Sequence, residues 1–152
     1  GELQLRGPNI VQRYWPDQPA VDADGWFTTG DLARQAEDGS WRIVGRTKEL
    51  IISGGENIHP AEIEQALGSH PAVAECAAFG LPDAQWGEIV AVAVVRHPGA
   101  LADEPALREH LQARLARFKQ PRRWLFLDAL PKTALGKVQR GLLARQVQSP
   151  GG

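Results

Sequence analysis

Hydrophobic residues after residue 45 run in short stretches that predict strands. Val73–Phe79 and Ile89–Arg96 have this pattern, and shorter stretches occur at 49–53 and 123–127. The stretch from Ile89 is almost wholly apolar, which is typical of an interior strand covered on both faces. We therefore predict a sheet in this region, with Ile89–Arg96 inside it.

Helical patterns separate these strands. Pro60 stands at a favourable first helical position, and Ile63, Ala66 and Leu67 then share one helix face. An arginine-rich second helix is predicted from an apolar repeat. The members of that repeat are Leu107, Leu111, Leu115 and Phe118. A third helix is predicted over 137–147. Because helices and strands mix without strict alternation, we predict a small α+β domain after residue 45.

Residues 1–45 have a different pattern. Turn signals break this stretch into strand-like runs at 2–6, 26–29 and 41–44, with a hairpin loop at 37–40. A segment so short and broken cannot bury a core of its own. We therefore interpret it as the edge of a larger β-rich body.

Composition excludes several classes of protein. The 17 Lys and Arg and 18 Asp and Glu give a net charge of -1, whereas a general nucleic-acid binder has a basic excess. The 43% hydrophobic content excludes an acidic disordered tail. The chain contains no methionine and starts at Gly1, so we expect that it was either processed or cut from a longer chain. The sequence shows no leader and no apolar run of membrane length. Its lone cysteine, Cys76, rules out an internal disulfide, so a reducing, cytoplasmic location is expected.

Charge is spread unevenly. Residues 1–99 contain 7 basic and 14 acidic side chains, whereas residues 100–152 contain 10 and 4. The basic part either attracts a polyanion such as a nucleotide or forms a solvated helical face. The lone Cys76 stands among apolar residues, which favours an inert thiol. The four histidines have no metal-ligand spacing, so no metal site is predicted.

Two of three notable segments contain candidate binding residues. In Thr29-Gly30-Asp31, which we place at the end of a strand, two carboxylate oxygens match a pair of vicinal hydroxyls; a turn that caps its own backbone is the alternative. In Gly45–Pro60, Arg46 has a forked donor suited to sugar or phosphate oxygens. Gly54-Gly55 in the same segment allows a ligand to approach the backbone.

The third segment is Pro131–Arg140. Its turn-forming residues are predicted to place Lys137 at the start of the last helix, where the helix N-terminus adds a positive field. A lysine there suits negative charge that develops during a reaction. A solvent-facing lysine without a role is the alternative.

In this order, the segments resemble the C-terminal part of the adenylate-forming superfamily: acyl-CoA synthetases, peptide-synthetase adenylation domains and luciferases. The resemblance runs through nearly the whole chain. It rests on Gly1-Glu2-Leu3 with Gly7, Thr29–Asp31, Gly45–Glu62, and Pro131–Thr133 with Gly136-Lys137. Within the superfamily, Ile52–Glu64 most resembles aryl- and fatty-acyl-CoA ligases.

The resemblance implies a two-step reaction with ATP, Mg²⁺ and coenzyme A. A carboxylate attacks the α-phosphate of ATP to give an acyl-adenylate, and the thiol of coenzyme A then displaces AMP. Asp31 and Arg46 would hold the ribose hydroxyls. Lys137 would be the catalytic lysine of adenylation. Lys48 would be the hinge, at a position where many relatives have aspartate.

The resemblance also assigns the loop from Ser53 to Asn57. This loop would swing in for thioester formation, with Gly54 and Gly55 in the coenzyme-binding turn and Gly54 beside the pantetheine arm. Asn57 would lie near the nucleotide. Residues 108–123 could meet the phosphates of the coenzyme.

Three parts of the chain follow from the resemblance. Residues 1–45 would be a remnant of the large N-terminal domain, 46–49 the hinge, and 50–152 the C-terminal α+β lid domain. The N-terminal domain would hold most of the ATP and Mg²⁺, so we expect the chain alone to have no ligase activity. Two alternatives stay open: a peptide-synthetase adenylation domain that loads a carrier protein, and a non-catalytic interaction module.

Overall fold

The computed structural model describes residues 1–148, and the chain divides into two compact units, Gly1–Lys48 and Glu49–Gly152. The first unit contains an antiparallel sheet in the order β1–β4–β5. Its strands are β1 (Glu2–Leu5), β4 (Phe27–Gln35) and β5 (Trp41–Arg46). A separate hairpin joins β2 (Arg13–Tyr14) to β3 (Gln18–Pro19). The short 3-10 helix η1 (Thr47–Glu49) runs across the division between the units.

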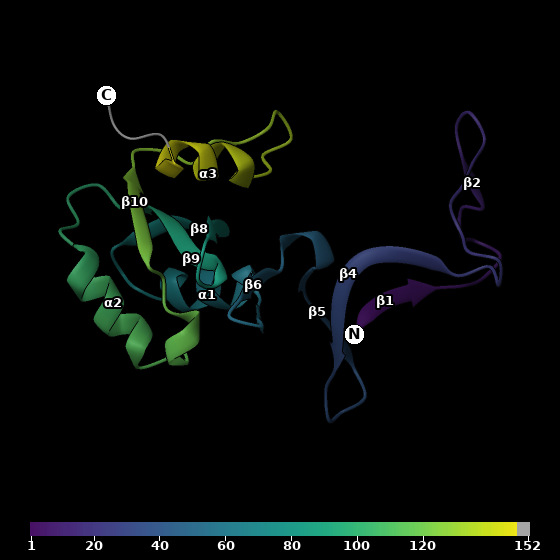
Figure 1. Ribbon diagram of the computed structural model, residues 1–152, viewed down its shortest axis with the longest axis horizontal. Coiled ribbons are helices and arrows are strands. Elements are labelled where there is room, and N and C mark those ends of the chain that lie inside the picture. Colours follow the sequence, from purple (N-terminus) through teal and green to yellow (C-terminus); the bar gives the residue numbers. More distant parts are fainter. Residues whose placement is uncertain (149–152) are drawn as a thin grey trace. The chain divides into compact units, whose positions relative to one another are not determined.

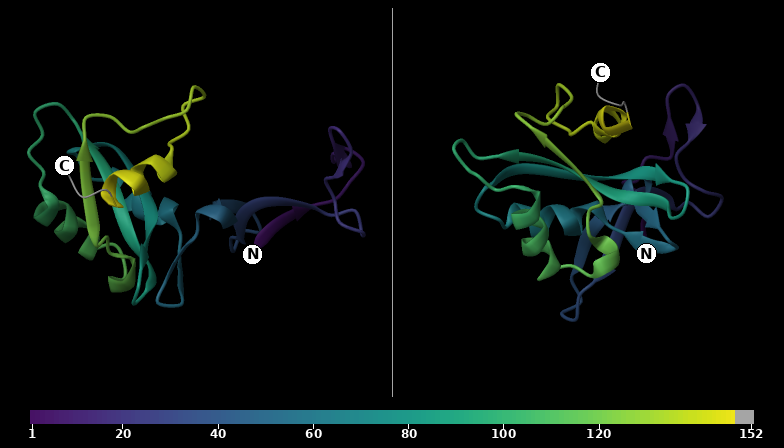
Figure 2. Two further views of the ribbon diagram at one scale, coloured as in Figure 1. Left: turned by 45° about the horizontal axis from the view of Figure 1, so that its top comes forward. Right: turned by 60° about the vertical axis from the view of Figure 1, so that its left-hand side comes forward.

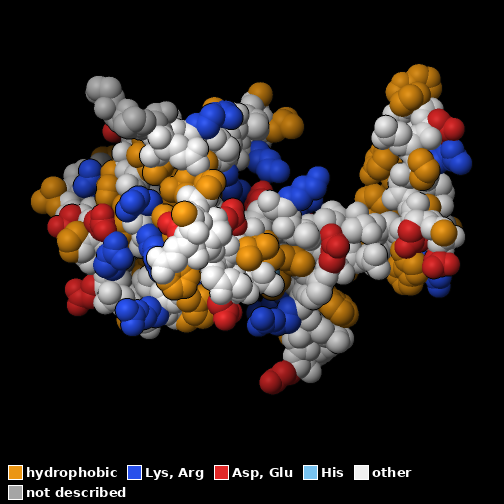
Figure 3. Space-filling model, viewed as in Figure 1, with side chains coloured by type: hydrophobic (Ala, Val, Ile, Leu, Met, Phe, Trp, Pro, Cys, Tyr) orange, Lys and Arg blue, Asp and Glu red, His pale blue; other side chains and the backbone are white. Residues whose placement is uncertain are grey.

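Few side chains in the first unit are buried. Ala33 is the one buried hydrophobic residue between Gly1 and Lys48, whereas Trp15 is 94% exposed. Figure 3 shows hydrophobic side chains gathered on the surface around the β2–β3 hairpin. The large hydrophobic side chains exposed in this unit are Leu5, Val11, Tyr14, Trp15, Trp41 and Ile43. This agrees with the expectation that the segment has no core of its own.

The second unit is built on a five-stranded sheet. β10, β9, β6 and β7 are neighbours in that order, and β8 pairs with β9. The bounds are β6 (Ile51–Ser53), β7 (Glu56–Ile58), β8 (Val73–Asp83), β9 (Gly87–Arg96) and β10 (Arg123–Leu127). β10 is parallel to β9, and the other pairs are antiparallel. The interior strand predicted from Ile89 is therefore confirmed.

Helices cover both faces of this sheet (Figures 1 and 2). They are α1 (Pro60–Gly68), α2 (Glu104–Gln112) and α3 (Arg140–Gln148), with a 3-10 turn η2 (Arg117–Lys119). Alternate residues of β9 join two separate cores. Val90, Val92 and Val94 pack with α1 and α2, and the residues between them pack with Leu143 of α3. The predicted α+β class is confirmed, and none of the helices among residues 1–148 is long and apolar enough to cross a membrane.

The second helix is shorter than its apolar repeat predicts. α2 ends at Gln112, Leu115 enters the core from the turn that follows, and Phe118 lies in η2. The side-chain nitrogen of Gln120 donates to the carbonyls of Leu111 and Leu115. These bonds satisfy carbonyls at the helix end, so the backbone can leave the helix while the apolar spacing continues.

The last helix begins later than predicted. α3 starts at Arg140, and Val138 pairs with Lys132 in an isolated bridge. The backbone N–H of Thr133 donates to the carbonyl of Lys137 at 2.8 Å, which holds the segment as a hairpin loop. The predicted place of Lys137 at a helix N-terminus is therefore wrong, and the helix field falls off too quickly to be assigned to it.

Candidate functional site

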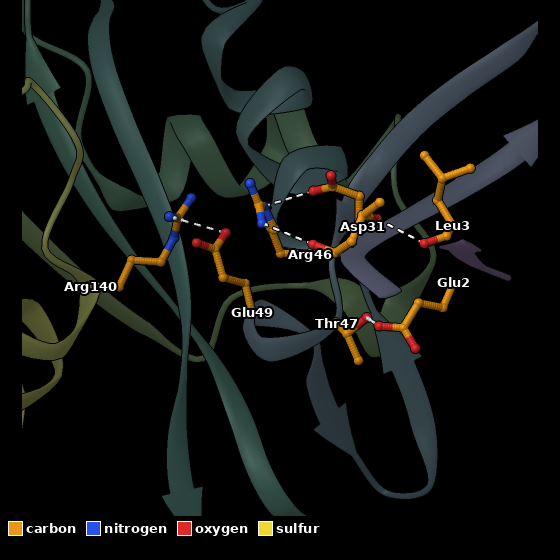
Figure 4. Close-up of polar contacts among 8 residues, drawn as sticks. Glu2, Leu3, Asp31, Arg46, Thr47, Glu49 and Arg140 are labelled. Atoms are coloured by element: carbon orange, nitrogen blue, oxygen red, sulfur yellow. Dashed lines mark hydrogen bonds and ion pairs between the residues drawn. The ribbon is translucent and has the colours of Figure 1, made fainter. Parts of the chain in front are cut away.

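Asp31 and Arg46 form an ion pair in the first unit. They stand opposite each other on β4 and β5, and the Nε of Arg46 donates to Oδ1 of Asp31 at 2.7 Å (Figure 4). The side chains are 26% and 54% exposed, so a carboxylate and a forked cation are presented together at a surface. The predicted strand end at Asp31 is wrong, because β4 continues to Gln35.

Local backbone bonds fix the position of Asp31. The hydroxyl of Thr29 donates to the carbonyl of Leu3 at 2.9 Å and accepts the N–H of Asp31 at 3.0 Å. Gly30 has a φ of 74°, and the β4–β5 register shifts just after Leu32. A glycine is needed for that left-handed conformation. The chain therefore kinks at Gly30 and then continues as part of β4. The Thr-Gly-Asp pattern alone had suggested that the strand ends there.

Lys48 is exposed and is the last residue of the first unit. The residue before it, Thr47, donates its hydroxyl to a carboxylate oxygen of Glu2 at 3.0 Å (Figure 4). The residue after it, Glu49, already belongs to the second unit. The role of Lys48 as a hinge stays a prediction.

Gly54 and Gly55 form the two-residue turn between β6 and β7. Their φ angles are 59° and 85°, as tight hairpin turns of this kind require. The N–H of Gly54 donates to the carbonyl of Trp86 at 2.8 Å, and a Cβ on Gly54 would lie 2.7 Å from the Trp86 ring. At position 54, both the left-handed backbone and the nearby Trp86 ring therefore favour glycine over any residue with a Cβ. Asn57 lies on β7 opposite Ile52 and is exposed.

A cleft of about 590 Å³ in the second unit begins at this turn. Its walls include Gly54, Glu56, Trp86, Phe118 and three arginines, Arg108, Arg117 and Arg122. The guanidinium of Arg122 lies 4.6 Å from the Trp86 ring centre. Arg123 does not line it, and its guanidinium donates to the carbonyl of Arg122. The cleft thus combines aromatic walls with positive charge, which suits a planar, anionic ligand.

Only some residues of this cleft belong to a stretch that was singled out from the sequence. The basic stretch 108–123 was predicted to meet phosphates, and three of its arginines line the cleft. Trp86 and Phe118 were not predicted as site residues. Trp86 stands beside Gly87 in the turn between β8 and β9, and no local pattern reports that this turn lies on Gly54, 32 residues earlier.

Lys137 lies in the hairpin loop between β10 and α3. Its N–H donates to the hydroxyl of Thr133 at 3.1 Å, and Gly136 before it has a φ of 82°. The backbone of the loop is therefore ordered, while the Lys137 side chain is exposed. None of the ion pairs found among residues 1–148 involves Lys137. The loop thus presents a cation that is not neutralised by its neighbours there.

Other titratable groups fit a structural role. Burial, with a smaller effect of the nearby Glu64 carboxylate, raises the pKa of the Cys76 thiol to about 11. A thiol so protonated is a poor nucleophile. Within residues 1–148, no three His, Cys, Asp or Glu side chains gather as metal ligands.

Comparison with known proteins relates these features to one family. Residues 62–137 match the model of the AMP-binding enzyme C-terminal domain. The chain is 48% identical to an indoleacetate–CoA ligase of Aromatoleum aromaticum over 153 residues, which covers 96% of the chain and 30% of the ligase. It therefore spans about 30% of the length of this relative.

Two solved structures have the same fold. ATP-bound MatB from Rhodopseudomonas palustris superposes with a TM-score of 0.88 at 38% identity, covering 98% of the chain and 30% of MatB. The o-succinylbenzoate CoA synthetase of Bacillus subtilis, in complex with the acyl-adenylate OSB-AMP, gives a TM-score of 0.85 at 36% identity and covers 99% of the chain and 31% of that enzyme. The chain therefore belongs to the family of AMP-binding enzyme C-terminal domains, found in adenylate-forming enzymes such as the acyl- and aryl-CoA ligases.

Proposed function

We propose that this chain is a fragment of an AMP-forming acid–CoA ligase, which activates a fatty or aryl acid with ATP and transfers it to coenzyme A, and that residues 50–152 are its mobile lid domain. The observation that best supports this function is the exposed Lys137 on its ordered loop. Its ammonium has no ion-pair partner among the residues described, so it is available for a ligand. The relatives named above include CoA ligases, which fits this chemistry.

In the first half-reaction, the acid carboxylate forms a bond to the α-phosphorus, and pyrophosphate leaves with the electrons of the broken P–O bond. Negative charge grows around the phosphorus during this step. Lys137 would contact the carboxylate and the α-phosphate oxygens there and stabilise the transition state more than the substrates. Its flexible stem allows the ammonium to follow the moving oxygens.

Asp31 and Arg46 would bind the ribose in this step. The two carboxylate oxygens of Asp31 accept hydrogen bonds from two hydroxyl groups, and Arg46 donates to a hydroxyl oxygen. Their ion pair holds both groups in place before the nucleotide binds. Asn57, exposed on β7, would contribute a polar contact near the nucleotide.

In the second half-reaction, the thiol of coenzyme A loses its proton and attacks the acyl carbon, and AMP leaves. Gly54 and Gly55 would let the pantetheine arm pass close to the backbone, because neither residue has a side chain. The cleft that starts at Gly54 would hold the nucleotide end of the coenzyme, with Trp86 against the base and Arg122 near a phosphate.

Both steps need the same space, so the part with Lys137 must leave before the part with Gly54 arrives. We propose residues 46–49, with Lys48 at the centre, as the hinge between residues 1–45 and the lid domain 50–152. The division of the chain after Lys48 supports this place for the hinge. Mg²⁺ would enter with ATP. The described residues offer no ligand cluster for it, so it is assigned to the nucleotide and the N-terminal domain.

Substitution of Lys137 tests the proposed function. In the longer enzyme, Lys137→Ala should lower the rate of adenylation by about 100- to 1,000-fold, measured as acid-dependent pyrophosphate exchange. Thioester formation from supplied acyl-adenylate should change less than about threefold. Arg145→Ala is the control, because Arg145 is an exposed cation on α3. Equal losses in the two half-reactions would contradict the assignment.

Two neighbouring arginines test the place of coenzyme A. Arg122 lines the cleft and Arg123 does not, although both are exposed. Arg122→Glu should raise the KM for coenzyme A by about tenfold or more, since a charge-assisted contact becomes a repulsion. Arg123→Glu should change it less than about twofold, and both should adenylate normally. An unchanged KM for Arg122→Glu would reject the cleft as the coenzyme site.

A further inference from the structure

We propose that Arg140 is a positioning residue, which links the loop that carries Lys137 to Glu49, the last residue of the proposed hinge and the first residue of the second unit. The inference rests on the proposed function, because it concerns how Lys137 is placed for adenylation. The contacts of Arg140 that support it all lie within the second unit.

One guanidinium contacts three segments that are far apart in the chain. Arg140 is the first residue of α3, and its side chain is 24% exposed. Its Nη2 donates to Oε1 of Glu64 on α1 at 2.8 Å, and its Nε donates to the carbonyl of Ala78 on β8 at 3.1 Å. Its Nη1 lies 3.3 Å from Oε2 of Glu49 (Figure 4).

The contacts with Glu64 and Ala78 anchor this guanidinium. Oε1 of Glu64 also accepts the N–H of Ala78 at 2.9 Å, so both backbone groups of the fully buried Ala78 are bonded to these two side chains. Both groups lie on the edge of β8 away from β9. A lysine could not replace this arrangement, because its single ammonium lacks the planar fork that reaches three acceptors.

The loop with Lys137 is closed immediately before Arg140. The N–H of Gln139 donates to the carbonyl of Pro131 at 2.8 Å, and its side chain donates to the carbonyl of Lys132 at 3.0 Å. Further along, Thr133 is bonded to the backbone of Lys137 in both directions. These hydrogen bonds fix the shape of the loop itself. Its orientation on the sheet then depends on the contacts at its base, and those contacts include the ones made by Arg140.

The contact of Arg140 with Glu49 is not needed to hold the guanidinium in place. Glu64 and Ala78 already satisfy the anchoring donors, and the Glu49 carboxylate is partly exposed at the start of the second unit. What the contact adds is a connection between the residue next to Lys48 and the base of the Lys137 loop. A rotation at the hinge would thus carry the loop with it, instead of leaving the loop to adjust separately.

Glu49→Gln is the most specific test, because it removes the charge of that contact and leaves the anchor intact. In the longer enzyme it should lower the adenylation rate by about tenfold, since small misplacements of a catalytic group are costly. Thioester formation from supplied acyl-adenylate and the melting temperature should stay close to those of the wild type. Arg140→Lys should lower adenylation at least as much, and adding Glu49→Gln to it should cause no further loss.

Amide hydrogen exchange of the chain itself gives a readout that does not depend on activity. Arg140→Lys should speed exchange at residues 133–139, whereas the control Arg145→Gln on the same helix should not.

Exchange and adenylation at wild-type levels in the Arg140→Lys variant, together with an inactive Lys137→Ala enzyme, would overturn the inference and leave the proposed function standing. Parallel losses in both half-reactions and in melting temperature for Glu49→Gln would also overturn it, since they indicate a structural contact only. If Lys137→Ala still adenylates, the proposed function fails, and wild-type exchange in Arg140→Lys would then reject the link independently.

Discussion

The two units of the chain are ordered by different means. The second unit has two hydrophobic cores, one on each face of its sheet, and β9 contributes to both. The first unit has strands of similar length but buries one hydrophobic residue, Ala33, and leaves its tryptophan and isoleucine side chains at 15, 41 and 43 exposed. Burial of apolar surface is the main source of stability, so the second unit contains its own stabilising core and the first depends on strand pairing or on a covering surface.

The candidate site residues differ in the same way. Asp31 and Arg46 are placed by cross-strand register in the thin first unit. Lys137 is placed by a hydrogen-bonded loop whose base lies on α3, and α3 is fixed to the sheet by the fully buried Leu143. A substitution that weakens packing should therefore disturb Lys137 through the fold, whereas Asp31 and Arg46 should respond mainly to local changes.

Separating the units gives the largest expected difference. Residues 49–152 expressed alone should fold, with dispersed NMR amide signals and a cooperative thermal transition, because both cores stay complete. Residues 1–48 alone should give the spectrum of an unfolded chain, since a small sheet without a hydrophobic core is not stable in water. A cooperative transition for residues 1–48 would contradict the comparison.

Two isoleucines provide a matched pair of substitutions. Ile63 on α1 is fully buried, whereas Ile43 on β5 is 58% exposed. Ile63→Ala should lower the free energy of unfolding by about 2–5 kcal/mol, through lost burial and a cavity. Ile43→Ala should change it by less than about 0.5 kcal/mol. Urea denaturation followed by circular dichroism measures both, and similar losses would show that the first unit has a core after all.

The sequence predicts best where the local pattern and the packing agree. The apolar stretch of β9 and the proline-led start of α1 follow directly from residue spacing, and both are confirmed. The end of α2 and the start of α3 were wrong, because side-chain bonds from Gln120 and Thr133 decide them and hydrophobic spacing does not report such bonds. Trp86 was missed for a related reason, since its contact with Gly54 joins distant parts of the chain.

Asp31→Asn should have a small effect on stability. The Asp31–Arg46 pair lies at a surface, where solvent screens the attraction, so the free energy of unfolding should change by no more than about 1 kcal/mol. In the longer enzyme the same variant should raise the KM for ATP, since it removes one acceptor proposed for the ribose. A loss of several kcal/mol in the unfolding measurement would instead show that the first unit depends on this pair.

Cys76 gives the smallest and most local test of the comparison. Burial of its thiol in the second unit raises the pKa to about 11 from a reference value of 9.0. At pH 8 the thiolate fraction is then about 100-fold lower than that of a free thiol, and alkylation by iodoacetamide should be slower by a similar factor. There are two controls. One is the urea-unfolded chain, and the other is a Gln18→Cys variant in a Cys76→Ala background, whose thiol lies in the exposed first unit.

The pH dependence of this reaction has a defined sign. Below pH 9 the thiol is protonated in both the folded and the unfolded chain, so Cys76 has little effect on stability there. Between about pH 9 and 11 the unfolded chain loses the proton first, so stability should fall as pH rises, and Cys76→Ala should remove that part of the decrease. Equal alkylation rates for Cys76 and Cys at position 18 at pH 8 would show that the strand β8 opens often enough to expose it. The second unit would then not be uniformly packed. Its weak point would be the edge of β8, where Glu64 and Arg140 are bonded to Ala78.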